Sequence, residues 1–128
     1  MNAIEMALKT EELVTTIVNA LEDVKAQNIC VYDTTDKTSA FERVIVASGT
    51  SNRQTRALGL AAARAVKEAG GKVSGLEGLD SGEWVLLDCG PVVLHAMQPL
   101  VRDYYNLAEL WGPHAMELAK SANTKTAE

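Results

Sequence analysis

A short run of small and polar residues, Ser48-Gly49-Thr50-Ser51-Asn52-Arg53, is the part of the sequence best suited to chemistry. It leads from an apolar run that favours a strand into a predicted helix, whose free N-terminal N–H groups would attract an anion such as phosphate. The Gly-Lys-Ser/Thr ending of a Walker loop and the further glycines of a Rossmann fingerprint are both missing. A structural role therefore competes with a ligand site, with Ser51 as a helix cap and Gly49 as a turn residue.

Nucleotidyltransferases also use a Gly-Ser or Gly-Thr turn between a strand and a helix, together with two carboxylates that hold divalent metal ions. No Asp-x-Asp or Asp-x-Glu pair follows Thr50, and Asp88 is a lone acid at a predicted hairpin. Neither His95 nor His114 stands beside a candidate nucleophile. We therefore expect no catalytic residues, and a small nucleotidyl or phosphoryl transferase that uses the Gly49 turn is the alternative.

The two cysteines, Cys30 and Cys89, each lie in an apolar run without the Cys-x-x-Cys or Cys/His spacing of a zinc or redox site. We expect two buried thiols, no metal and no cofactor. The first 24 residues contain Lys9 as their only cation and no long apolar run, which argues against a signal peptide, a transit peptide and a membrane span. The expected location is the cytoplasm, with no membrane partner.

The charge of the chain is uneven. With 128 residues and a formal net charge of -5, the chain is predicted to form one acidic domain, which argues against broad binding of nucleic acid. Residues 51–72 nevertheless hold five basic residues and one acidic residue. At helical spacing, four of the cations share the face opposite the apolar residues: Arg53, Arg56, Arg64 and Lys67. This basic stripe is either an RNA-proximal surface or a solvated face.

Apolar periodicity predicts the elements that position these residues, in the order helix, strand, strand, helix, strand, strand, strand, helix. The helices are expected over 10–27, 51–69 and from 98 onward, and the strands over 29–32, 44–47, 71–76, 84–88 and 91–97. This order predicts an α/β (α+β) fold with a mixed five-stranded sheet and flanking helices. Residues 1–113 would form the single domain, with 114–128 as a partly disordered tail. The packing residues of the last helix are predicted to be Leu100, Val101, Tyr104 and Tyr105.

The last two strands form a predicted hairpin whose faces differ. With Cys89 and Gly90 as a two-residue loop, Trp84 lies opposite His95, and one face is entirely aliphatic. The other face, here called the mixed face, combines an aromatic residue, a methionine and polar groups, as protein-binding surfaces do. It consists of Trp84, Leu86, Asp88, Val93, His95 and Met97. The alternative is that helices cover both faces and these residues are ordinary core.

Five segments, taken together, carry a family resemblance. They are ASGTSNRQ (47–54), EGL (77–79), EWVLLDCG (83–90), VVLH (92–95) and YNL followed by LW (105–111). In this order they resemble the ribosomal silencing factors of the Iojap family, from the first predicted helix to Trp111. The chain departs from the family pattern at Phe41-Glu42-Arg43, at Pro91 and at Met97, and Pro91 leaves the register of the hairpin open.

The resemblance implies a nucleotidyltransferase-like fold without the catalytic metal site. It also implies that the chain binds the large ribosomal subunit through large-subunit ribosomal protein fourteen, blocks subunit joining sterically and represses translation under nutrient limitation. The family's Glu-Trp, Asp-x-Gly and Val-His segments match Trp84, Asp88 with Gly90, and His95, which favours the mixed face as the partner-binding surface. A homodimer through an open sheet edge is compatible with the same fold.

Overall fold

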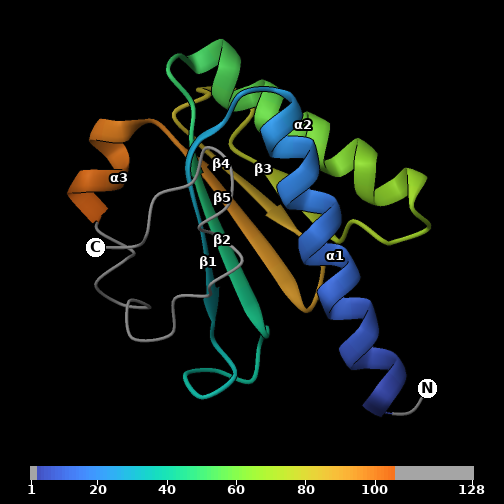
Figure 1. Ribbon diagram of the computed structural model, residues 1–128. Helices are drawn as coiled ribbons and strands as arrows, with labels where there is room; N and C mark the ends of the chain where they lie inside the picture. The colour runs from blue at the N-terminus through green and yellow to red at the C-terminus, as the bar shows by residue number, and fades with distance from the viewer. Residues whose placement is uncertain (1–2, 106–128) are drawn as a thin grey trace.

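The computed structural model describes residues 3–105 of the chain (Figure 1). Its elements are α1 (Ala3–Asp23), β1 (Gln27–Asp33), β2 (Arg43–Ser48), α2 (Asn52–Glu68), β3 (Gly75–Glu77), β4 (Trp84–Asp88), β5 (Val92–Met97) and α3 (Pro99–Tyr105). The predicted order of helices and strands is confirmed. The predicted domain boundary at 113, the tail, Trp111 and His114 lie outside the described residues.

The five strands form one sheet in the order β1-β2-β5-β4-β3. The central pair, β2 and β5, is parallel, and the other three pairs are antiparallel. The prediction of a mixed five-stranded sheet is therefore confirmed. Because α2, β3 and β4 lie between β2 and β5 in the chain, this central pairing joins segments that are far apart in the sequence.

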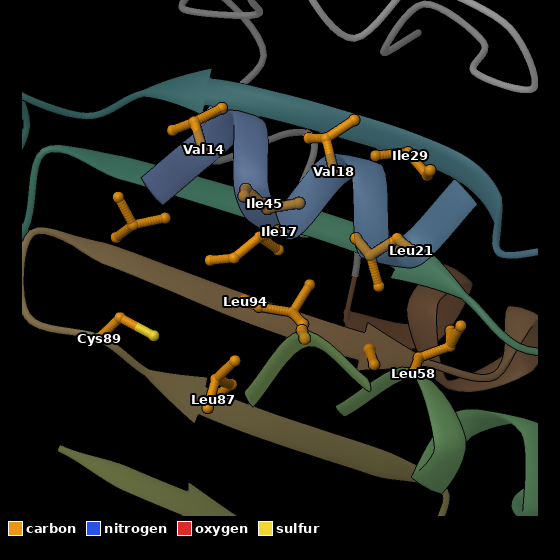
Figure 2. Close-up of a cluster of buried hydrophobic side chains, with 14 of the residues drawn as sticks. Val14, Ile17, Val18, Leu21, Ile29, Ile45, Leu58, Leu87, Cys89 and Leu94 are labelled. Atoms are coloured by element: carbon orange, nitrogen blue, oxygen red, sulfur yellow. The ribbon is translucent and has the colours of Figure 1, made fainter. Parts of the chain in front are cut away.

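Helices α1 and α2 lie side by side on one face of the sheet, and α3 lies on the opposite side (Figure 1). Figure 2 shows how the covered face is filled: Ile17 and Leu21 of α1 and Leu58 of α2 point toward strand residues such as Ile45 and Leu94. All five side chains are fully buried. Apart from Cys89, the core on this face is aliphatic.

Both ends of α2 are capped, and Ser51 caps the first end as predicted. The Ser51 hydroxyl accepts a hydrogen bond from the Gln54 N–H at 3.0 Å. At the other end Gly70 has φ +89°, its N–H donates to the carbonyl of Lys67, and the Gly71 N–H donates to that of Val66. This is the Schellman arrangement, whose left-handed position favours glycine.

The bounds of α1 differ from the prediction of 10–27, because the helix runs from Ala3 and stops at Asp23. It ends in the same hydrogen-bond pattern as α2, with Lys25 in the left-handed position at φ 67° and Ala26 N–H bonded to the carbonyl of Leu21. The Gln54 amide donates to the carbonyls of Val24 and Lys25, so α2 supports this turn. Because the residue in the left-handed position is a lysine and not a glycine, the sequence did not indicate that α1 ends here.

Candidate partner-binding face

The register of the β4–β5 hairpin differs from the prediction. Its two-residue loop is Gly90-Pro91, and the Cys89 N–H donates to the Val92 carbonyl at 3.0 Å. Gly90 has φ +84°, as the first central position of a type II′ turn requires, and Pro91 occupies a position that needs no N–H donor. Trp84 therefore lies opposite Met97 rather than His95. The predicted pairs are wrong by two residues, and an even shift keeps every side chain on its predicted face.

The burial of the hairpin confirms the division into two faces. The aliphatic face is completely buried under α1 and α2: Val85, Leu87, Val92, Leu94 and Ala96. On the mixed face Trp84, Leu86, Asp88 and His95 are partly exposed. Val93 is 8% exposed and Met97 is fully buried, so these two form the floor of the mixed face.

The floor of the mixed face continues across the sheet. Val93 pairs with Val44 of β2, and His95 pairs with Val46. A second buried cluster lies there, composed of Cys30, Tyr32, Val44, Val46 and Met97. Burial raises the pKa of the Tyr32 phenol above its ordinary value, so the ring is uncharged at neutral pH. The mixed face is thus apolar over β1 and β2 and becomes polar and open toward β4.

Trp84 stands where this apolar floor meets the open part of the face. Its indole Nε1–H donates a hydrogen bond to His95 Nδ1 at 2.9 Å. The ring of Tyr105 lies 4.7 Å from the indole, centroid to centroid, and Met97 and Val101 belong to the same apolar cluster. Burial lowers the pKa of His95 to about 4, so the imidazole is neutral at physiological pH.

Arg102 attaches α3 to the sheet. Its Nη1 group donates to the carbonyl of Asn28 at 2.7 Å and to the Ser48 hydroxyl at 2.9 Å, and its Nη2 lies 3.4 Å from the Cys30 sulfur. The Gln98 N–H also donates to the Glu83 carbonyl, next to β4. These bonds place α3 at the end of the mixed face, beside Trp84.

The predicted packing of α3 is wrong for two residues. Leu100 is 83% exposed and Tyr104 is 82% exposed, while Val101 is partly buried and Tyr105 contacts Trp84 at 54% exposure. The seven-residue helix has two neighbouring apolar stripes at i, i+4 spacing, and it can turn only one of them to the sheet. Together with Trp84 and Glu83, α3 lines a recess of about 370 Å³. The exposed stripe of Leu100 and Tyr104 could have been predicted from its i, i+4 spacing. Nothing in the sequence indicated that Arg102 would bind the sheet.

The turn at Gly49 uses its polar groups within the protein. The Thr50 N–H and hydroxyl both donate to the Gln54 side-chain oxygen, at 2.6 and 2.7 Å. A Cβ atom at Gly49 would lie 2.5 Å from the Thr55 hydroxyl, so glycine is required by close packing. These contacts give the turn a structural role. Within residues 3–105 no cluster of His, Cys, Asp and Glu side chains could hold a metal ion.

The basic stripe on α2 divides into two parts. Arg56 donates to the carbonyls of Leu79 and Asp80, both at 3.4 Å, and so supports the loop before β4. The other three cations are exposed: Arg53, Arg64 and Lys67.

Both cysteines are buried, as predicted. Burial, with a smaller effect of Asp88, raises the pKa of the Cys89 thiol to about 11. None of the described helices is long and apolar enough to span a membrane.

Comparison with known proteins places the chain in one family. Residues 7–128 match the family described as "Ribosomal silencing factor during starvation". The ribosomal silencing factor RsfS of Chromobacterium violaceum is 46% identical over 115 residues, which cover 90% of this chain and 94% of that protein. A crystal structure of a protein from the same organism matches with a TM-score of 0.78 and 50% identity, and covers 80% of this chain and 85% of the other.

A more distant relative is the mouse protein named mitochondrial assembly of ribosomal large subunit protein 1. It is 29% identical over 98 residues, which cover 74% of this chain and 43% of the mouse protein. The family match over nearly the whole chain, the high identity to a bacterial factor and the shared fold agree with one another. The chain belongs to the ribosomal silencing factors of the Iojap family.

Proposed function

We propose that this chain binds the large ribosomal subunit, chiefly through large-subunit ribosomal protein fourteen, and keeps the small subunit from joining by steric hindrance. Translation would fall under nutrient limitation, and the chain would act in the cytoplasm without catalysing a reaction. Family membership supports this proposal, as does the name of the mouse relative, which refers to assembly of the large ribosomal subunit.

The observation that carries the proposal is the position of Trp84 on the face opposite α1 and α2. A partly exposed indole there adjoins the exposed side chains of Leu100, Tyr104 and Tyr105, and aromatic side chains of this kind are enriched at protein interfaces. In this proposal Trp84 is the central anchor. Leu86, Asp88 and His95 surround it, and Val93 and Met97 form the floor that supports the contact.

Co-sedimentation with purified large ribosomal subunits tests the anchor. We expect Trp84→Ala to weaken binding at least about 30-fold, because truncating an aromatic hot spot costs ~2 kcal/mol or more. Leu60→Ala is the matched control, since Leu60 is 50% exposed on α2, away from the mixed face, and its truncation should leave binding unchanged. If Trp84→Ala sediments with the subunit as well as the unmutated chain at the same salt concentration, the anchor assignment is wrong.

The exposed part of the basic stripe is proposed to make a peripheral contact with ribosomal RNA. Reversing the charge of Arg53, Arg64 and Lys67 should flatten the dependence of binding on salt, by about one unit of slope for each phosphate that is no longer neutralised. Lys37→Glu is the control, because Lys37 is an exposed cation in the loop between β1 and β2. If the salt dependence of binding is unchanged, the stripe does not contact RNA and is a solvated surface.

Self-association is an alternative use of the same fold. Strands β1 and β3 are the edges of the sheet and can offer unpaired backbone groups to a second copy. Sedimentation of the free protein over a range of concentrations distinguishes a monomer from a homodimer.

A further inference from the structure

The hydrogen bond between Trp84 and His95 joins two residues that are diagonal neighbours in the hairpin. His95 lies directly opposite Leu86, and Trp84 lies directly opposite Met97. Long aromatic side chains can reach a diagonal partner on the adjacent strand. The indole Nε1 and the imidazole Nδ1 are 2.9 Å apart, and the ring centroids are 5.7 Å apart with the planes tilted by 50°. The contact is therefore a directed hydrogen bond and not a ring stack.

The direction of this bond specifies the state of the imidazole. An indole N–H can only donate, so His95 Nδ1 must accept and the ring proton must lie on Nε2. Burial favours the same neutral form. A protonated imidazole would present two donors and could not accept the bond. His95 thus serves the indole as a fixed acceptor.

Three other contacts limit the movement of the indole. The ring of Tyr105 lies against it at a centroid distance of 4.7 Å, and Met97 and Val101 pack in the same apolar cluster. Tyr105 belongs to α3, which Arg102 holds on the sheet. The sheet and α3 therefore both restrain the side chain that the proposed function assigns as anchor.

We propose that His95 is a positioning residue, whose Nδ1 atom orders the Trp84 indole for docking on the ribosomal protein before the partner arrives. Binding then loses less side-chain entropy than it would with a mobile anchor. This inference rests on the proposed function and changes the role of His95 within it. His95 acts through Trp84, and the partner meets an indole already held in one orientation.

Two substitutions at His95 test the proposal. His95→Phe keeps a planar ring and removes the acceptor, and His95→Asn supplies an amide oxygen close to the position of Nδ1. The first measurement is hydrogen exchange of the indole Nε1–H by nuclear magnetic resonance on the free protein. The Trp84→Phe variant identifies the resonance. We expect at least tenfold faster exchange in His95→Phe and slow exchange restored in His95→Asn.

The second measurement is the affinity for purified large subunits. We expect His95→Phe to weaken binding by about three- to tenfold and His95→Asn to restore it. In the Trp84→Phe background, which lacks the donor, His95→Phe should have no further effect, because the two residues act as a pair. Circular dichroism of each variant establishes that it is folded.

The outcomes separate this inference from the proposed function. Unchanged exchange in His95→Phe, or faster exchange with unchanged affinity, would overturn the positioning role while leaving the docking face intact. An equal loss of affinity in His95→Phe with or without the indole donor would also overturn it, since His95 would then contact the partner directly. If Trp84→Ala binds as well as the unmutated chain, the proposed function fails at its anchor and the positioning role fails with it.

Discussion

The two faces of the β4–β5 hairpin are made from the same two strands and are filled in opposite ways. The face under α1 and α2 contains only aliphatic side chains, all fully buried. The mixed face combines a buried apolar floor with an indole, an imidazole and a carboxylate that remain partly exposed. On the covered face, only the shape and volume of a side chain determine whether it packs well. On the mixed face, its hydrogen-bonding groups also determine how it is placed.

A change in sequence should therefore affect folding on the covered face and binding on the mixed face. The covered face is sealed by two long helices, so its side chains can contribute only to stability. The mixed face is bordered by the seven-residue α3, whose exposed Leu100 and Tyr104 extend the open surface. Adjacent residues of one strand therefore differ in role, one contributing to stability and the next to the proposed binding surface.

Leu87 and its neighbour Leu86 lie on opposite faces of β4, and truncating them should have very different effects on stability. Leu87 is fully buried under the helices, and Leu86 is partly exposed on the mixed face. Leu87→Ala should lower the free energy of unfolding by about 2–5 kcal/mol, because it leaves a cavity in a packed core. Leu86→Ala should lower it by about 1 kcal/mol or less and should weaken binding to the large subunit instead. Urea unfolding of both variants makes the comparison, and equal losses of stability would contradict the division of the faces.

The next prediction uses pH to change the charge of His95 on the mixed face. Unfolded histidine has a pKa of about 6.5, whereas burial lowers that of His95 to about 4. Between these values the unfolded chain binds a proton that the folded chain excludes. The free energy of unfolding should therefore fall as the pH drops from about 7 to 4, by up to ~3 kcal/mol, and this contribution should be complete above pH 7.

His95→Phe lacks this titration and is the reference for the pH series. All other ionisable groups are common to both proteins, so the difference in unfolding free energy between the two proteins isolates the imidazole. That difference should change steadily between pH 7 and 4 in the direction that disfavours the unmutated chain at low pH. Parallel stability curves over this range would show that His95 is not held neutral by burial.

The smallest effect concerns the attachment of α3. Arg102→Gln removes the bonds to the Asn28 carbonyl and the Ser48 hydroxyl, and should lower the free energy of unfolding by about 1–2 kcal/mol. Binding to large subunits should weaken as well, because Tyr105 would no longer be held against Trp84. Asp103→Asn, at the exposed neighbouring position, is the control. If Arg102→Gln alters neither stability nor binding, α3 does not help to shape the mixed face.

The sequence predicted the fold more fully than the detailed geometry of the site. The order of the elements and the two faces of the hairpin were predictable, because strand side chains alternate with a period of two and burial follows that alternation. The pairing of Trp84 with Met97 was not, because it depends on which two residues form the loop. When the loop moves by one residue along the chain, each residue's partner on the opposite strand changes by two residues. Every pair is then different, but each side chain stays on the same face.

Local patterns in the sequence are enough to predict the N-cap of α2, the aliphatic face of the hairpin and the position of Trp84 and His95 together on its other face. Other features appear only in the folded chain: β2 pairs with β5, Arg102 reaches the Asn28 carbonyl and the Ser48 hydroxyl, and Trp84 donates to His95. The first group depends on backbone preferences and on the burial of apolar side chains within single elements. The second depends on which distant groups the packed sheet brings within hydrogen-bond distance, and directed bonds of that kind leave no periodic pattern in the chain.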